Sequence, residues 1–370
     1  MKGTNARDEI RISYRQELLL MLNFLLANAF IIIPSAAVKG AKQDGWMTIA
    51  LATVTGIGLT MLHTTLGMRY PRQTLVQYAQ VILARVPGKM VGLLFMWFAL
   101  HLGALVVRNF GDFMVITLMP ETPRIVFHAV IMLVVVLALY GGLEVLCRFN
   151  EGLTFLVVVS IIFVLVLSLS IEGFDLKKLL PPFENGLLPV LKTSLIPITF
   201  PFGETVLFTM IIPYLDEQEK ARRAHIVAMA GAGTLLTLIT VAVVAVFGVT
   251  ALDYLYPTHS LTRCISIVAA PERIDAISIS VWILSGLIKI AVCLFVFVTG
   301  SAQMLNLKDY RPLLLPSGVI MTALSVLVYE NIMEQIDFAV KVWPVYSLPF
   351  EVGIPLLLLA VSLVGPDRAA

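Results

Sequence analysis

The residues with the clearest chemical potential lie in one short segment, where Pro197, Pro201, Gly203 and Glu204 interrupt a long apolar stretch. Proline removes a backbone donor and clashes with the preceding helical turn, and glycine permits the bend that follows. Inside a bilayer, backbone freed in this way is tolerated only where protein or a wet cavity surrounds it. A broken helix that carries a carboxylate at this depth is typical of a ligand site.

Glu204 follows the point where a second half-helix would begin. Its carboxylate could simply interact with the free amides of that helix end, or it could accept an ammonium group from a ligand. The flanking threonines could bind the same ligand or satisfy local carbonyl groups. From this segment we predict a ligand-binding set that consists of Thr199, Phe200, Gly203, Glu204 and Thr205.

A second polar patch interrupts the first apolar stretch, where residues 26–30 read Leu-Ala-Asn-Ala-Phe and Pro34 follows one turn later. The free amides of a half-helix that starts near residue 30 would favour an anion such as a ligand carboxylate. We therefore predict ligand contacts at Asn28 and Ala29, although Asn23 and Asn28 could also hold helices together. A zwitterion suits a carboxylate at one break and free amides at the other.

Three ionisable residues share one face of a later stretch, because His101, Arg108 and Asp112 are spaced by seven and four residues. Counting from Lys89 at about 1.5 Å per residue places His101 near mid-membrane and Arg108 near the outer surface. We predict that His101 contacts the ligand, with a satisfied interior histidine as the alternative. Arg108 and Asp112 can pair and are predicted to form an ion pair in an outer vestibule.

Two more ionisable residues lie deep within apolar stretches. Lys289 is too far from either end of its stretch to reach water, so it could lose its proton, stand in for a bound cation or pair with a carboxylate. Glu351 lies beside Pro349 and could also belong to a pair. We predict that Lys289 and Glu351 couple the site to an ion or proton. His63 is interpreted as an ordinary packing group.

The composition predicts the elements that must position these residues. The chain has 370 residues, of which 59% are hydrophobic and only 14% charged, and its mean hydropathy is +0.93. Soluble domains contain about 25% charged residues. A membrane span needs about 20 apolar residues. The chain is therefore predicted to be an all-α polytopic membrane protein with ten spans, at about 13–41, 45–68, 87–117, 124–140, 143–170, 187–215, 222–249, 274–303, 312–329 and 339–365.

The loops predict the orientation of these spans. With the N-terminus in the cytoplasm, the inside loops carry more Lys and Arg than the outside loops, which favours both termini inside. The two breaks fall in spans one and six, so the halves would cross the bilayer in opposite directions. That is the signature of a 5+5 inverted repeat, here 11–171 and 187–365 within a single transmembrane domain, 1–370.

The sequence argues against several other classes. It contains no H-E-x-x-H, G-x-S-x-G, Walker or C-x-x-C motif, so we predict no catalytic residue, metal or cofactor. Its three cysteines are widely spaced and are expected to be free thiols. The net charge of +2 and the lack of a basic, aromatic-interleaved patch argue against nucleic-acid binding.

Several motifs together resemble a known family. They are Ile-Ser-Tyr-Arg-Gln at 12–16, Ile33-Pro34 with Gly45-Trp46, Tyr70-Pro71, and Pro-Phe-Gly-Glu at 201–204. With them the chain resembles the B subunit of bacterial spore germinant receptors, within the amino acid–polyamine–organocation transporter superfamily. One departure is that the first break reads Ala-Asn-Ala at 27–29, where superfamily transporters often carry glycines.

The resemblance implies a role. Such subunits lie in the inner membrane of the dormant spore and work with a membrane-anchored A subunit and a lipoprotein C subunit. They bind a small nutrient, often an amino acid, and the complex triggers ion release and germination. The main alternative is a proton- or sodium-coupled amino-acid transporter, and a third class is an ion channel through the same broken helices, because one fold serves several functions.

Overall fold

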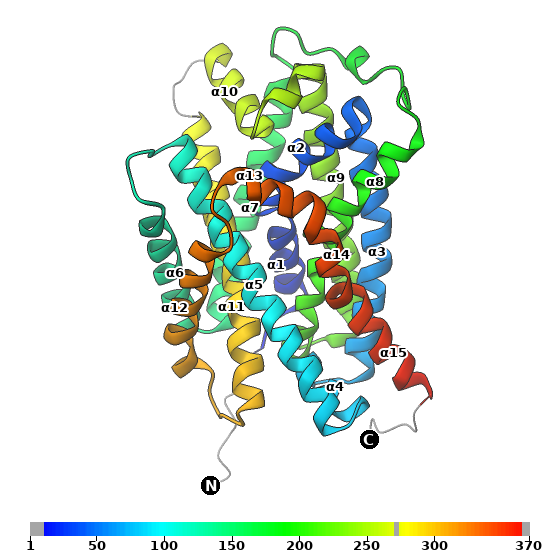
Figure 1. Ribbon diagram of the computed structural model, residues 1–370, viewed down its shortest axis with the longest axis vertical. Helices are drawn as coiled ribbons and strands as arrows, with labels where there is room; N and C mark the ends of the chain where they lie inside the picture. The colour runs from blue at the N-terminus through cyan, green and yellow to red at the C-terminus, as the bar shows by residue number, and fades with distance from the viewer. Residues whose placement is uncertain (1–10, 270–273, 365–370) are drawn as a thin grey trace.

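The structure is a computed structural model that describes residues 11–269 and 274–364. All regular elements in these two ranges are helical, apart from a single bridge between Ile12 and Leu215 (Figure 1). The prediction of an all-α protein is therefore confirmed.

The helices divide into long rods and short irregular turns. The long ones are α1 (Tyr14–Leu26), α2 (Ala29–Ala41), α3 (Gly45–Arg69), α5 (Arg85–Thr117), α6 (Arg124–Tyr140), α7 (Leu143–Ser168), α8 (Leu187–Pro197), α9 (Ala221–Phe247), α10 (Pro257–Ala269), α11 (Ile274–Met304), α12 (Arg311–Leu327) and α15 (Ile354–Val364). The shorter ones are α4 (Leu75–Ile82), α13 (Ile332–Asp337), α14 (Trp343–Leu348), η1 (Lys42–Asp44), η2 (Leu176–Leu179), η3 (Ile198–Phe202), η4 (Gly203–Met210), η5 (Ile212–Tyr214), η6 (Gln218–Lys220), η7 (Gly248–Asp253), η8 (Phe338–Val342) and η9 (Pro349–Gly353).

Length and hydropathy make the chain a multi-pass membrane protein. Six helical stretches within the described ranges are long and apolar enough to cross a bilayer: Ala29–Arg69, Arg85–Thr117, Leu143–Ser168, Gln218–Asp253, Ile279–Met304 and Ile332–Val364. Two shorter apolar helices are Arg124–Tyr140 and Arg311–Leu327. The first of the six contains the turn η1 between α2 and α3, which pack against each other. The count of ten spans stays a prediction.

The first predicted break is present at the junction of α1 and α2. A capping box of Ser13 and Gln16 starts α1, which ends at Leu26. Ala27 leaves the helical conformation, with φ −29° and ψ −97°, and α2 starts at Ala29. The break is therefore at Ala27, whereas Asn28 already has helical angles, φ −81° and ψ −15°.

The second predicted break is present between α8 and η4. Phe200 has extended backbone angles, φ −129° and ψ 110°, inside the widened turn η3, and the tighter helix η4 begins at Gly203. The hydroxyl of Thr199 donates to the carbonyls of Leu195 (3.0 Å) and Ile196 (3.2 Å). The Thr205 hydroxyl donates to Phe202 O at 2.8 Å. Both threonines therefore satisfy local carbonyls, the alternative that the sequence left open.

The two breaks lie together near the middle of the bundle (Figure 1). Helix α1 packs against α7, α9 and α11, and it also contacts η3 and η4. Helix α3 packs against α8 and α9 and ends where Arg69 donates to the carbonyl of Ser362 in α15 (2.9 Å). The start of α9 lies at this end too, because Arg222 donates to the Thr65 hydroxyl of α3. The start of the described chain is close by, since the N–H of Ile12 donates to the carbonyl of Tyr214, a few residues before α9. We call this end the α3-terminal end.

Candidate ligand-binding site

A cavity of about 520 Å³ runs from the two breaks toward the end of the bundle that lies opposite the α3-terminal end. Its deep part is lined by Asn28 from the first break and by Phe200 and Glu204 from the second. Its walls are mostly apolar, with Leu102, Leu105, Val106, Ile196 and Trp282 among them. Its lining reaches the exposed lysines Lys39, Lys192 and Lys341. The cavity therefore combines a polar floor with apolar walls and a cationic mouth.

Glu204 is paired inside the protein. Lys289 Nζ lies 2.5 Å from Glu204 Oε2, and both side chains are fully buried. The same ammonium lies over two aromatic rings, 4.6 Å from the centroid of Phe24 and 4.9 Å from that of Phe200. The other carboxylate oxygen, Glu204 Oε1, makes no hydrogen bond within the described part of the chain. The pairing alternative for Lys289 is thus observed, and its partner is Glu204.

A second carboxylate flanks the same turn. Glu351, in η9, is fully buried, and its carboxyl group packs so closely on Gly203 that a Cβ atom there would collide with it. Neither carboxylate oxygen of Glu351 has a hydrogen-bond partner among the described residues. Glu351 also lies within electrostatic reach of Glu204 and Lys289. The structure therefore brings together Gly203, Glu204, Lys289 and Glu351 from three separate elements.

His63 lies beside this cluster as well, and its contacts are those of the packing group that the sequence predicts. Its Nε2 lies 2.7 Å from the carbonyl oxygen of Glu351, and a carbonyl can only accept, so His63 donates. The His63 side chain is 1% exposed, and its other ring nitrogen lies 3.5 Å from the Thr205 hydroxyl. The histidine thereby holds η9 against α3 beside the second break.

At the first break, Asn28 has no partner of its own. Its side chain is fully buried, yet neither its amide oxygen nor its amide nitrogen makes a hydrogen bond within the described ranges. Ala29 is buried as the first residue of α2 but does not line the cavity. Asn23 has the helix-holding role, because it donates to Asn150 at 2.6 Å and also bonds to Ser285. Asn28, the residue before α2, therefore lines the cavity with a buried side chain that has no hydrogen-bond partner in the described ranges.

The predicted residues on α5 lie outside the cavity lining. His101 Nδ1 is 3.0 Å from the Tyr346 hydroxyl, and its ring stacks on Trp97 with centroids 5.5 Å apart. Arg108 and Asp112 are fully buried and pair at 2.8 Å, as their spacing predicts. Asp112 also binds Arg124 at 2.5 Å, which ties α5 to α6. The pairing is observed, and a vestibule role for it stays a prediction.

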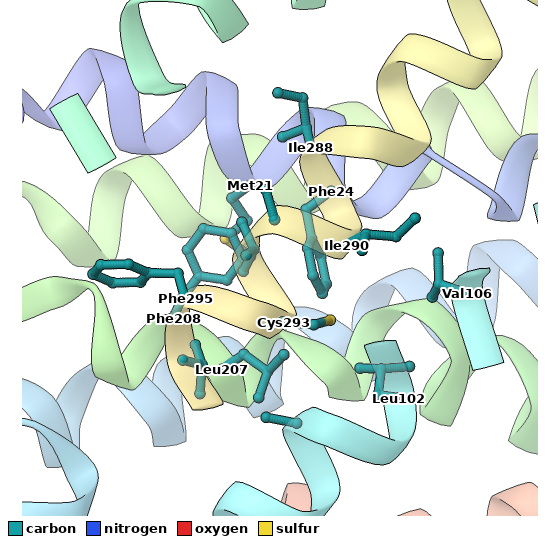
Figure 2. Close-up of a cluster of buried hydrophobic side chains, with 14 of the residues drawn as sticks. Met21, Phe24, Leu102, Val106, Leu207, Phe208, Ile288, Ile290, Cys293 and Phe295 are labelled. Atoms are coloured by element: carbon teal, nitrogen blue, oxygen red, sulfur yellow. The ribbon is translucent and has the colours of Figure 1, made fainter. Parts of the chain in front are cut away.

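Packed apolar side chains separate the Glu204–Lys289 pair from the α3-terminal end. Figure 2 shows Met21 and Phe24 from α1, Leu207 and Phe208 from η4, and Cys293 and Phe295 from α11 in one cluster, which we call the apolar seal. The rings of Phe24 and Phe208 meet edge to face, with centroids 5.4 Å apart. The cavity therefore ends at the pair.

The sequence matches, over residues 11–333, the model of a family described as spore germination protein. The chain belongs to this family. Among its relatives in Bacillus subtilis (strain 168), spore germination protein KB is 27% identical over 98% of this chain and 97% of its own length. Spore germination protein YndE, from the same organism, is 23% identical over 80% and 82% of the two chains.

Solved transporter structures share the fold of this spore germination protein. MhsT in complex with L-phenylalanine has a TM-score of 0.69 and 16% identity, over 96% of this chain and 99% of that chain. A nucleobase-cation-symport-1 family transporter with bound bromovinylhydantoin has a TM-score of 0.68 and 13% identity, over 92% and 78%. A Na⁺-coupled sialic acid symporter has a TM-score of 0.68 and 11% identity, over 99% and 91%. The chain therefore shares its fold with solved transporters.

Sequence reasoning missed other buried polar residues of this spore germination protein. His225 Nε2 lies 2.9 Å from Glu17 Oε1, and both side chains are buried, so the contact joins α9 to α1. The signal for Glu17 was available, since it is a carboxylate in the first turn of an apolar span. Trp282 and Gln335, which line the cavity, carry no local signal that separates them from other helix residues.

Proposed function

We propose that this protein is the germinant-recognition subunit of a spore germination receptor and binds a small ligand, an amino acid, in the cavity at the two helix breaks. One observation carries the proposal: Asn28 from the first break and Glu204 from the second line the floor of the same cavity, each with an unused hydrogen-bonding atom. Buried polar atoms in a native protein are normally satisfied, so these point to a ligand.

The chemistry of the floor suits a zwitterion. The free oxygen of Glu204 accepts from an ammonium group, and the amide of Asn28, beside the start of α2, donates to a carboxylate. The walls, which include Leu105, Ile196 and Trp282, suit an apolar side chain. Small-ligand sites usually combine a mostly apolar lining with a few convergent polar groups in about 300–1,000 Å³.

The proposal includes the finer architecture. Ten spans form a single domain, 1–370, in two inverted halves, 11–171 and 187–365, with both termini in the cytoplasm. Two observations support this architecture: the two breaks lie close together in the centre of the bundle, and the chain shares the fold of solved transporters. The cavity mouth then faces outward, with the Arg108–Asp112 pair on the same outer half and His101 near the middle of the membrane.

The partners are part of the proposal too. The relatives' names place them in spore germination, which supports a position in the inner membrane of the spore with A and C subunits beside this chain. Within the site, Lys289 and Glu351 supply the charge that couples ligand binding to an ion or proton, because they are buried against the same turn.

The test is Glu204→Gln in the full chain, with binding of a panel of L-amino acids and protein abundance measured together. We expect binding to fall while abundance is retained. The matched control is Glu172→Gln, a change of the same type at an exposed loop position, which leaves binding unaltered. Unchanged binding by the Glu204 variant at unchanged abundance would contradict the proposal.

A proton- or sodium-coupled amino-acid transporter is the second candidate, and the transporter fold favours it. Purified protein in liposomes separates the two functions. Concentrative uptake driven by a pH or sodium gradient supports transport, whereas binding without flux supports a receptor. Ligand-gated conductance in planar bilayers would instead indicate a channel.

A further inference from the structure

The ammonium group of Lys289 is surrounded by groups that suit an ammonium ion. A carboxylate contacts it at 2.5 Å, and the faces of Phe24 and Phe200 lie 4.6 Å and 4.9 Å away. Proteins recognise ammonium ligands by the same combination of negative charge and aromatic faces. We call Glu204, Phe24 and Phe200 the ammonium cage. Its occupant is a side chain of the protein itself.

Part of the ammonium cage belongs to the ligand cavity. Glu204 and Phe200 line the cavity, whereas Lys289 does not, so the lysine approaches the cage from the α11 side. Glu204 Oε1 lacks a hydrogen bond within the described chain, although its partner oxygen holds Lys289. A ligand ammonium that reaches the floor of the cavity therefore meets a carboxylate that Lys289 already neutralises.

Two buried carboxyl groups lie at the cage, and Lys289 pairs with one of them. Glu351 lies against the turn that carries Glu204, and no ion pair is formed by Glu351 in the described ranges. The groups that face Glu351 are Glu204 from η4, Lys289 from α11, the Ser347 hydroxyl from α14 and His63 from α3, which bonds to its backbone carbonyl. Lys289 thus pairs with Glu204 alone, and a buried carboxyl group without a cation keeps its proton rather than a charge.

We infer that Lys289 is a displaceable internal ligand: a ligand ammonium takes its place at Glu204, and Lys289 moves to Glu351. Glu351 releases its proton when Lys289 arrives, so the exchange ends with two carboxylates and two ammonium groups, and each buried charge has a partner. The flexible four-carbon stem of lysine allows its charge to serve either acceptor. This inference rests on the proposed function, and it adds that the ligand must carry an amine.

The exchange also gives binding a mechanical consequence. Lys289 links α11 to η4 in this structure, and after the exchange it links α11 to η9 instead. A ligand without an ammonium group, such as a neutral sugar, fills the cavity but leaves Lys289 at Glu204. Whether the ligand carries an ammonium group thereby decides whether Lys289 links α11 to η9 or to η4.

The ammonium cage can be tested without knowledge of the germinant. Lys289→Ala removes three carbons and the ammonium, which together have the outline of n-propylammonium. We expect n-propylammonium to bind the purified full-length variant at least about tenfold more tightly than 1-propanol, measured by thermal shift and calorimetry. Adding Glu204→Gln removes that preference. Lys308→Ala, at an exposed position outside the cavity, gains no binding. Equal binding of the amine and the alcohol, or an unchanged preference in the double variant, would overturn the cage.

The exchange itself is tested by the dependence on Glu351. With Lys289 present, Glu351→Gln removes the acceptor to which the lysine moves, so n-propylammonium should bind at least about tenfold more weakly. In the Lys289→Ala background the same change should alter affinity by less than about threefold, since no lysine has to move. Equal effects in the two backgrounds would refute the exchange.

These results are separable from those on the proposed function. If the propylammonium results are as expected and no amino acid binds the intact chain, the cage and the exchange hold and the amino-acid proposal fails. If amino acids bind the intact chain and Glu351→Gln leaves their affinity unchanged, the exchange fails and the proposed function holds.

Discussion

Three neutralising substitutions around one buried lysine should have unequal effects on stability. Lys289→Met leaves the Glu204 carboxylate without its cation, beside the second buried carboxyl group of Glu351. Removing one partner of a buried ion pair costs about 3–5 kcal/mol, and this variant should fall in that range. Glu204→Gln keeps an amide oxygen for the lysine and leaves Glu351 as a second acceptor, so about 1–3 kcal/mol is expected. Glu351→Gln changes a carboxyl group that has no hydrogen bond within the described residues, and it should be neutral or stabilise by up to about 1 kcal/mol.

The free energy of unfolding can be measured by SDS titration of the purified protein in mixed micelles at neutral pH, with tryptophan fluorescence and helical circular dichroism as signals. Glu172→Gln is the control, and its effect should stay within about 0.5 kcal/mol because the side chain is exposed. The order of the three variants is the decisive quantity. The reasoning is refuted if Lys289→Met is no more destabilised than Glu204→Gln, or if Glu351→Gln loses more than about 2 kcal/mol.

Three further predictions concern the polar and glycine contacts of the bundle. Asn28→Ala should weaken amino-acid binding about tenfold, seen by calorimetry, with stability unchanged because its amide has no protein partner; loss of stability instead of affinity would contradict this. Asn23→Leu should cost about 1–2 kcal/mol in SDS titration because it leaves Asn150 and a serine hydroxyl unpaired, and a neutral result would show that these bonds contribute nothing. Gly286→Ala should cost about 1–3 kcal/mol because its methyl group would collide with the Phe110 ring, whereas Gly58→Ala, with open space around it, should not destabilise; equal effects would rule out the steric cause.

Local chemistry made both helix breaks predictable. Proline and glycine disturb the helical turn that contains them. The helix is therefore interrupted in the structure at the segment that ends at Glu204, where the sequence predicts the break. The dipeptide Ala27-Asn28 was found in the same way, from a polar group within an apolar run. The family motif Pro-Phe-Gly-Glu coincides with the second break for the same physical reason.

Pairings between distant elements could not be predicted. Lys289 and Glu204 are 85 positions apart, and His63 reaches a carbonyl 288 positions away. Sequence spacing carries no information about such contacts, because helix packing decides which faces meet. Spacing did predict Arg108 with Asp112, since both lie on one helix, but the additional partner Arg124 comes from the next helix.

The apolar seal determines whether a route for solutes passes through the middle of the bundle. Its rings and aliphatic groups, with Phe24 against Phe208, leave no polar path between the Glu204–Lys289 pair and the α3-terminal end through that cluster. Under the proposed function, the seal lies between a solute bound in the cavity and the α3-terminal end. Under that proposal, the ligand can bind while the seal stays packed, and flux along this route requires the side chains of the seal to separate.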